Sequence, residues 1–131
     1  MKKIIEVVAA IIIKDKKVFT AQRKDEGELA KKWEFPGGKI EKNETQEMAL
    51  KRELKEELNI NISNIKYFMT VNHEYESFKL ILHSYKCSIE SKNINLNEHL
   101  NSKWLSFNDL DKVDWAAADL PIVKKLKDLN G

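Results

Sequence analysis

The sequence has little of what marks the specialised classes of protein. It holds one cysteine, Cys87, together with 2 prolines and 4 glycines in 131 residues. A single cysteine excludes an internal disulfide framework and a cysteine-based zinc site, and it favours a reducing, cytoplasmic compartment. So few prolines and glycines exclude collagen and argue against low-complexity linkers. We therefore expect residues 1–131 to form a single domain.

Long apolar runs and an excess of one charge are also lacking. The longest apolar run, Val7 to Ile13, is too short to span a membrane, and the N-terminus lacks the apolar core of a signal peptide. The 23 basic and 21 acidic residues leave a net charge of +2. That near-balance gives no basis for bulk electrostatic binding to nucleic acid or lipid. We therefore expect neither a nucleic-acid polymer nor a membrane as a partner.

The residues that are present predict a mixture of strands and helices. Residues 4–13 are apolar and rich in β-branched side chains, which is typical of a buried strand. Further strands are expected at 18–23, 33–35, 62–75, 78–90 and 104–105, with loops at 24–32 and 91–101. A short helix is expected from Ser106 to Leu110, and a final helix is expected to begin at Asp119. The fold class is therefore α/β.

The clearest helix is predicted from Thr45 to Leu58. Leu50, Leu54 and Leu58 recur every four residues and form one apolar stripe. Thr45 is a favourable N-cap. Asn59 stands where a helix commonly ends in the left-handed conformation.

Three glutamates project from one face of this helix. Glu53 stands three residues before Glu56 and four before Glu57, so the three carboxylates lie close together and repel one another. A hard divalent cation such as Mg²⁺ would relieve that repulsion, since it prefers carboxylate oxygens and substrate phosphates. For an isolated acidic cluster, a solvated helix surface is the plainer interpretation. The residues around the cluster decide between the two.

The surrounding spacing resembles the Nudix box, Gx5Ex7REUxEExGU, in which U is an aliphatic residue. The one departure is Asn59, which stands where the family has glycine, and both residues tolerate a left-handed turn. The matching positions are Gly38, Glu44, Arg52, Glu53, Leu54, Glu56, Glu57 and Ile60.

The resemblance extends beyond the box. The stretch Trp33 to Glu41, WEFPGGKIE, resembles the MutT-type branch of the Nudix hydrolases, as do the strand pair ending at Arg23 and the tail Ala117 to Pro121. The closest likeness is to the CTP pyrophosphohydrolase subgroup, which is similar to the enzymes that cleave 8-oxo-dGTP. Residues 61–103 carry the least specific part of the likeness.

This resemblance implies a fold and an activity. The expected fold is an α/β/α sandwich around a mixed β-sheet, with the Nudix box as a loop–helix–loop. The expected activity is Mg²⁺-dependent hydrolysis of a nucleoside triphosphate to a monophosphate and pyrophosphate, with Mn²⁺ as a substitute metal. The substrate, a small nucleotide, would be the main partner of a protein that we expect to be a monomer, although an edge strand leaves a dimer open.

The resemblance also implies roles for individual residues. Arg52 would orient a carboxylate, and either Glu53 or Glu98 would remove a proton from the attacking water. The expected catalytic residues are therefore Glu53, Glu98, Arg52 and Glu57. The expected metal ligands are the Gly37 carbonyl and the carboxylates of Glu53, Glu56, Glu57 and Glu98.

Four residues are expected to bind the substrate. Arg23 could hold a phosphate through its guanidinium, and Phe35 could stack on the base. Gly38 removes a side chain where the backbone must approach a ligand closely. An ionised Asp119 only accepts hydrogen bonds, which suits the N4 amino group of cytosine. Oxidised guanine is the alternative, because protonation of Asp119 would remove the conflict with its O6 acceptor.

Other functions remain open at this point. Within the enzyme class, the alternatives are hydrolysis of 8-oxo-dGTP, ADP-ribose or dinucleoside polyphosphates, because the box holds only metal and pyrophosphate. A non-catalytic Nudix ligand sensor is a further alternative, although no box glutamate is lost. A small RNA-binding module lacks support, because the sequence shows no basic face with exposed aromatic residues.

Overall fold

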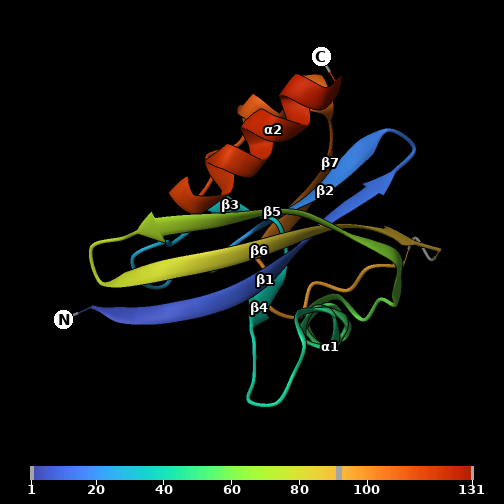
Figure 1. Ribbon diagram of the computed structural model, residues 1–131. Coiled ribbons are helices and arrows are strands. Elements are labelled where there is room, and N and C mark those ends of the chain that lie inside the picture. Colours follow the sequence, from blue (N-terminus) through green and yellow to red (C-terminus); the bar gives the residue numbers. More distant parts are fainter. Residues whose placement is uncertain (1, 91–92, 131) are drawn as a thin grey trace.

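The computed structural model describes residues 2–90 and 93–130, and a mixed β-sheet forms its centre (Figure 1). Strand β1 (Lys3–Lys14) pairs in parallel with β6 (Phe78–Ile89) and antiparallel with β4 (Gly37–Lys39). Strand β5 (Ile62–Glu74) pairs antiparallel with β6 at the edge.

A second group of strands continues from the end of β1. Strand β2 (Lys17–Gln22) pairs antiparallel with the last residues of β1. It also pairs antiparallel with β3 (Trp33–Glu34) and with β7 (Asn101–Ser106). The main path through the sheet is therefore β3-β2-β1-β6-β5.

The two α-helices cover opposite faces of the sheet (Figure 1). Helix α1 (Gln46–Leu58) packs its leucines in a cluster with Val8, Ala10 and Ile12, whereas α2 (Leu120–Asn130) belongs to a cluster with Ala9 and Ile11. Alternate residues of β1 thus enter opposite layers, which explains why its apolar run is nearly continuous. The predicted α/β/α sandwich around a mixed sheet is confirmed.

The predicted ends of α1 are confirmed. The Thr45 hydroxyl accepts a hydrogen bond from the Met48 backbone N–H at 3.1 Å. Asn59 adopts the left-handed conformation, with φ 54° and ψ 43°, and its N–H reaches the carbonyls of Leu54 and Lys55. Asparagine therefore serves in place of the family's glycine at this helix end.

Other boundaries differ from the prediction where the partner is distant in sequence. Strand β7 begins at Asn101, inside the expected 91–101 loop, because it pairs along the whole of β2. Residues 91–92 of that loop lie outside the described residues. Gly37 and Gly38, for which no strand was expected, belong to strand β4. The expected helix from Ser106 to Leu110 is a 3₁₀ helix, η1 (Phe107–Lys112).

A second 3₁₀ helix, η2 (Ala117–Asp119), leads into α2, so the last α-helix begins one residue after the predicted Asp119. Within the part of the chain that the structure describes, no helix is long and apolar enough to cross a membrane.

Candidate active site

A cavity of about 600 Å³ is lined by carboxylates from separate elements. Helix α1 contributes Glu53 and Glu57, and η2 contributes Asp119. The glycines of β4 and apolar side chains of the central strands complete much of the wall. Further lining residues that bear on the chemistry are Arg23, Glu34, Phe35, Gly37, Gly38 and Tyr75.

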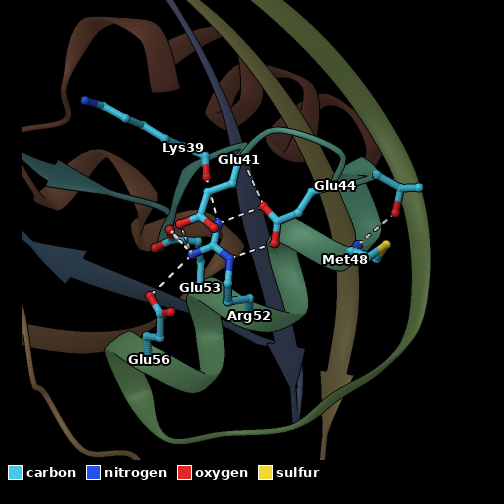
Figure 2. Close-up of polar contacts among 8 residues, drawn as sticks. Lys39, Glu41, Glu44, Met48, Arg52, Glu53 and Glu56 are labelled. Carbon is cyan, nitrogen blue, oxygen red and sulfur yellow. Dashed lines mark hydrogen bonds and ion pairs between the residues drawn. The ribbon is translucent and has the colours of Figure 1, made fainter.

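Arg52 fastens the loop after β4 to helix α1 (Figure 2). Its Nε and Nη2 donate to the two carboxylate oxygens of Glu44, at 2.7 and 2.9 Å, and Nη2 also donates to the Lys39 carbonyl at 2.9 Å. This two-point pairing lowers the pKa of Glu44 to about 2, with help from the Glu41 N–H. Arg52 therefore orients a carboxylate, but the one it holds at both oxygens is Glu44.

The remaining nitrogen of Arg52 is shared between two of the predicted metal ligands. Nη1 donates to Glu53 at 2.8 Å and to Glu56 at 3.3 Å. Burial nevertheless raises the pKa of Glu53, against the opposing effect of Arg52. Glu56 keeps 60% of its side chain exposed and does not line the cavity. The three box glutamates therefore differ in environment, although they share one helix face.

Glu57 is the least compensated of these acids. Burial, followed by the charges of Glu34 and Glu53, raises its pKa to about 8. Its Oε1 is buried and has no hydrogen-bond partner among the described residues. A buried carboxylate in this state is stabilised by a cation or by a proton.

The two glycines of β4 are required by close packing. A Cβ added to Gly38 would lie 2.3 Å from the carboxylate of Glu53, and one added to Gly37 would lie 1.9 Å from the backbone oxygen of Val8. Gly38 thus makes the space that the Glu53 carboxylate occupies. Gly37 lets β4 approach β1 closely.

The donor set fits a hard divalent cation. Carboxylate and backbone carbonyl oxygens are the ligands that Mg²⁺ prefers, and the unpartnered Glu57 Oε1 supplies one. No three His, Cys, Asp or Glu side chains of the described residues are already gathered around one point. Arg52 partly explains why the carboxylates are not gathered, because its Nη1 donates hydrogen bonds to Glu53 and Glu56. A bound cation would compete with Arg52 for these oxygens.

Asp119 also lines the cavity, although it is far from the Nudix box in the sequence. Its side chain is buried, and its Oδ1 accepts from the Phe35 backbone N–H at 3.3 Å. Burial and the charge of Glu34 raise the pKa of Asp119 well above its usual range. These effects favour the protonated form of the carboxyl, which both donates and accepts a hydrogen bond.

Phe35 reaches the cavity wall with part of its ring already covered. It is 2% exposed, and its ring lies 4.7 Å from that of Trp115, tilted by 34°. The ring can therefore offer a base only the surface that faces away from Trp115. Its backbone N–H fixes Asp119, which is a second role that the sequence did not indicate.

Glu34, which the sequence did not indicate as a site residue, lines the cavity and pairs with Arg23. Glu34 accepts from Arg23 Nη1 at 2.9 Å through one oxygen, and His99 Nε2 lies 2.9 Å from its other oxygen. Its charge raises the pKa of both Glu57 and Asp119, so Glu34 stands near both groups. No local pattern reveals the contact with His99, because 65 residues separate the two side chains.

Glu98 lies near the acidic cluster but outside the cavity wall. Its side chain is 59% exposed and pairs with Lys24 at 3.7 Å. Its charge contributes to the raised pKa of Glu57. The structure thus places the last predicted carboxylate close enough to the box for its charge to act on Glu57.

These features define a class: an α/β/α domain with a loop–helix–loop acidic site that suits a divalent cation. The chain belongs to the Nudix family, because the family model described as the NUDIX domain matches residues 7–125. Nudix hydrolases generally need a divalent metal ion.

Relatives with enzymatic names match nearly the whole chain. The CTP pyrophosphohydrolase of Escherichia coli K12 is 37% identical over 93% of this chain and 90% of its own length. The 8-oxo-dGTP diphosphatase of Buchnera aphidicola subsp. Schizaphis graminum is 31% identical over 92% of each chain. The expected family and its hydrolase character are confirmed.

Solved structures agree. A MutT protein of the Nudix family from methicillin-resistant Staphylococcus aureus 252 is 45% identical over the full length of both chains, with a TM-score of 0.79. The E. coli ORF135 protein is 34% identical over 99% of this chain and 93% of its own, with a TM-score of 0.82.

Proposed function

We propose that this protein hydrolyses a nucleoside triphosphate to a nucleoside monophosphate and pyrophosphate with the help of Mg²⁺ or Mn²⁺. The observation that carries the proposal is the shared cavity. Glu53 and Glu57 line it together with Asp119, so one ligand can meet the metal-binding acids with its phosphates and Asp119 with its base. The two named relatives above support the same chemistry.

The site residues have separate proposed roles in metal binding and phosphate binding. Glu53, Glu56, Glu57, Glu98 and the Gly37 carbonyl are the proposed metal ligands. A divalent cation held there would neutralise phosphate charge and acidify a water molecule. Arg23 holds a phosphate through its guanidinium, which Glu34 orients by accepting from Nη1.

The reaction proceeds by attack of water on the β-phosphorus. Glu53 is the proposed base that takes the water proton, because it lines the cavity and Glu98 does not. The bond between the β-phosphorus and the oxygen that bridges to the α-phosphorus breaks. The monophosphate leaves with that oxygen, and the water oxygen remains on pyrophosphate.

We infer that cytosine nucleotides are the first candidate substrates. Cytosine presents the N4 donor beside the N3 acceptor, and the protonated form of Asp119, which burial favours, would offer the complementary acceptor and donor. The 37% identity to a CTP pyrophosphohydrolase supports this choice.

The burial of Asp119 also favours a second candidate, 8-oxo-dGTP. Its base presents the O6 acceptor beside an N7 hydrogen, which a neutral carboxyl matches equally well. An ionised Asp119 would repel the O6 acceptor, whereas the protonated form, which burial favours, would donate to it.

A hydrolysis panel scored by product identity tests the proposal. The panel contains CTP, dCTP, 5-methyl-dCTP, 8-oxo-dGTP, dGTP, ADP-ribose and diadenosine tetraphosphate, each with and without Mg²⁺. We expect monophosphate and pyrophosphate from the cytosine nucleotides. Preference for 8-oxo-dGTP would select the second candidate, and activity on ADP-ribose alone would contradict the proposed substrate class.

A further inference from the structure

The segment 95–100, which carries Glu98, is fastened to the end of helix α1. Backbone N–H groups of Asn95 and Asn97 donate to the carbonyls of Leu58 and Glu57, each at 3.0 Å. The Asn97 side-chain Nδ2 donates to the Glu56 carbonyl at 2.9 Å. The last carbonyls of a helix have no partners within it, so this segment satisfies groups that α1 leaves open.

The same segment is fastened again immediately after Glu98. His99 has only 3% of its side chain exposed, and its Nε2 lies 2.9 Å from Glu34 Oε2. The next backbone N–H, that of Leu100, donates to the Gln22 carbonyl at 3.0 Å. The residues on both sides of Glu98 are therefore held, one to the acidic helix and one to a side chain of the cavity wall.

The side chain of Glu98 itself has no comparable restraint. Its ion pair with Lys24 is 3.7 Å long between side chains that are 59% and 49% exposed. Such surface pairs contribute little. The position of Glu98 beside Glu57 is therefore set through its backbone neighbours.

We propose that Asn97 and His99 are positioning residues that hold Glu98 at the metal site. The proposal rests on the proposed function, in which Glu98 is a metal ligand. Asn97 connects the segment to the backbone of Glu57, whose carboxylate belongs to the same site. His99 fixes the other side through Glu34, which also holds Arg23. The pair thus sets the distance between a loop carboxylate and the helix carboxylates.

The test compares four variants and one control variant with the wild type, and it also combines His99→Leu with Glu98→Gln. His99→Leu removes the contact with Glu34 while it keeps an apolar side chain of similar size. His99→Gln keeps a donor near the position of Nε2. Glu98→Gln removes the positioned charge, and Asn97→Ala removes an exposed anchor without a change to the core. His83→Leu is the matched control, because its ring contacts Thr70 and it does not line the cavity.

Two readouts are needed. The first is kcat and KM on the best nucleotide of the panel. The second is the affinity for Mn²⁺ alone, measured as the loss of the free-ion electron paramagnetic resonance signal, which requires no hydrolysis.

We expect His99→Leu to lower kcat about tenfold and to weaken Mn²⁺ binding, with KM changed less than about twofold. His99→Gln should retain most of the wild-type kcat and Mn²⁺ affinity. Asn97→Ala should lower both by less than His99→Leu does, and His83→Leu should change neither. In the Glu98→Gln background, His99→Leu adds less than about twofold, because the residue it positions is already lost.

A full additional loss in that background, or unchanged kinetics and Mn²⁺ binding in His99→Leu, would overturn the proposal. Failure of the wild type to hydrolyse any nucleotide would overturn the proposed function instead. In that case the Mn²⁺ affinities of the same variants still decide whether Asn97 and His99 position Glu98.

Discussion

The two sides of the acidic loop–helix carry the same kind of residue in opposite states. On the Arg52 side, Glu44 has a guanidinium at both oxygens, and its pKa falls to about 2. On the cavity side, burial and neighbouring acids raise the pKa of Glu57 to about 8. A carboxylate with its own cation holds the backbone together, whereas one without a cation can take a ligand from outside. The difference separates structural from functional glutamates within one motif.

The largest expected effect is the loss of the uncompensated acid. Glu57→Gln should reduce kcat/KM by at least about 10²-fold, because it removes a metal ligand and leaves the fold intact. The metal-free variant should melt at the same temperature as wild type or higher, since a buried acid is removed. Addition of Mg²⁺ should raise the melting temperature of wild type only.

Calorimetry with and without Mg²⁺, together with the hydrolysis assay, checks this prediction. More than about a tenth of wild-type activity in Glu57→Gln, or in Glu53→Gln, would show that the site is assigned to the wrong carboxylates.

The next effect comes from the space that Gly38 leaves for Glu53. Gly38→Ala places a methyl group 2.3 Å from the Glu53 carboxylate, so that side chain must move. We expect a loss of about tenfold to a hundredfold in kcat, with the α1 fold retained. Steady-state kinetics measure the loss, and circular dichroism checks the fold. Gly27→Ala is the matched control, since an added Cβ there meets no atom within 4 Å, although its φ of +74° adds some strain.

A pH titration sharpens the comparison between the two sides. Metal must displace the proton on Glu57, so Mg²⁺ affinity should rise up to about tenfold per pH unit and level off near pH 8. The folded pKa lies above the unfolded one, so this group's contribution to stability is full below about 4.5 and is lost as pH rises to about 8. The stability of the metal-free protein should fall across that window. Isothermal titration calorimetry from pH 6 to 9 measures the affinity, and a pH-independent affinity contradicts the assignment.

The smallest expected effect lies on the Arg52 side. Arg52→Lys keeps the charge but loses the two-point contact with Glu44, so we expect a lower melting temperature and a loss of activity of about threefold to tenfold. The pKa of Glu44 should rise towards its ordinary value. Its contribution to stability exists above the unfolded pKa of about 4.5 and is lost as pH falls to about 2, so the variant should be less resistant to acid. Acid unfolding curves measure this, and coincident curves would show that the pair does not stabilise the loop.

Local signals predicted the helix well, and non-local contacts account for what they missed. Thr45 and Asn59 fixed the ends of α1 because capping depends on residues within one turn. The extent of β7 depends on β2, which is far away in sequence, so its first residues looked like loop. The strand character of Gly37 could not be predicted for the same reason, since it arises from pairing with Ala9.

The site divides in the same way. The spacing of Glu53, Glu56 and Glu57 was sufficient to predict a shared helix face. It could not predict that Glu56 stays exposed while Glu57 is buried, because that depends on the sheet beneath the helix. Nor could it reveal Glu34 and His99, whose contact joins two separate segments of the chain.

The parallel pairing of β1 with β6 has a consequence for how the chain folds during synthesis. Lys3 pairs with Phe78 and Ile12 with Cys87. Strand β1, which is synthesised first, therefore cannot form this pairing until β6 has been synthesised. Until then the apolar segment from Val7 to Ile13 lacks its long parallel partner. Contacts between residues so distant in sequence slow folding, and they leave hydrophobic surface exposed in intermediates that are prone to aggregation. We therefore expect truncated chains that end before β6 to aggregate, and chains that include α2, which covers the second face of the sheet, to fold.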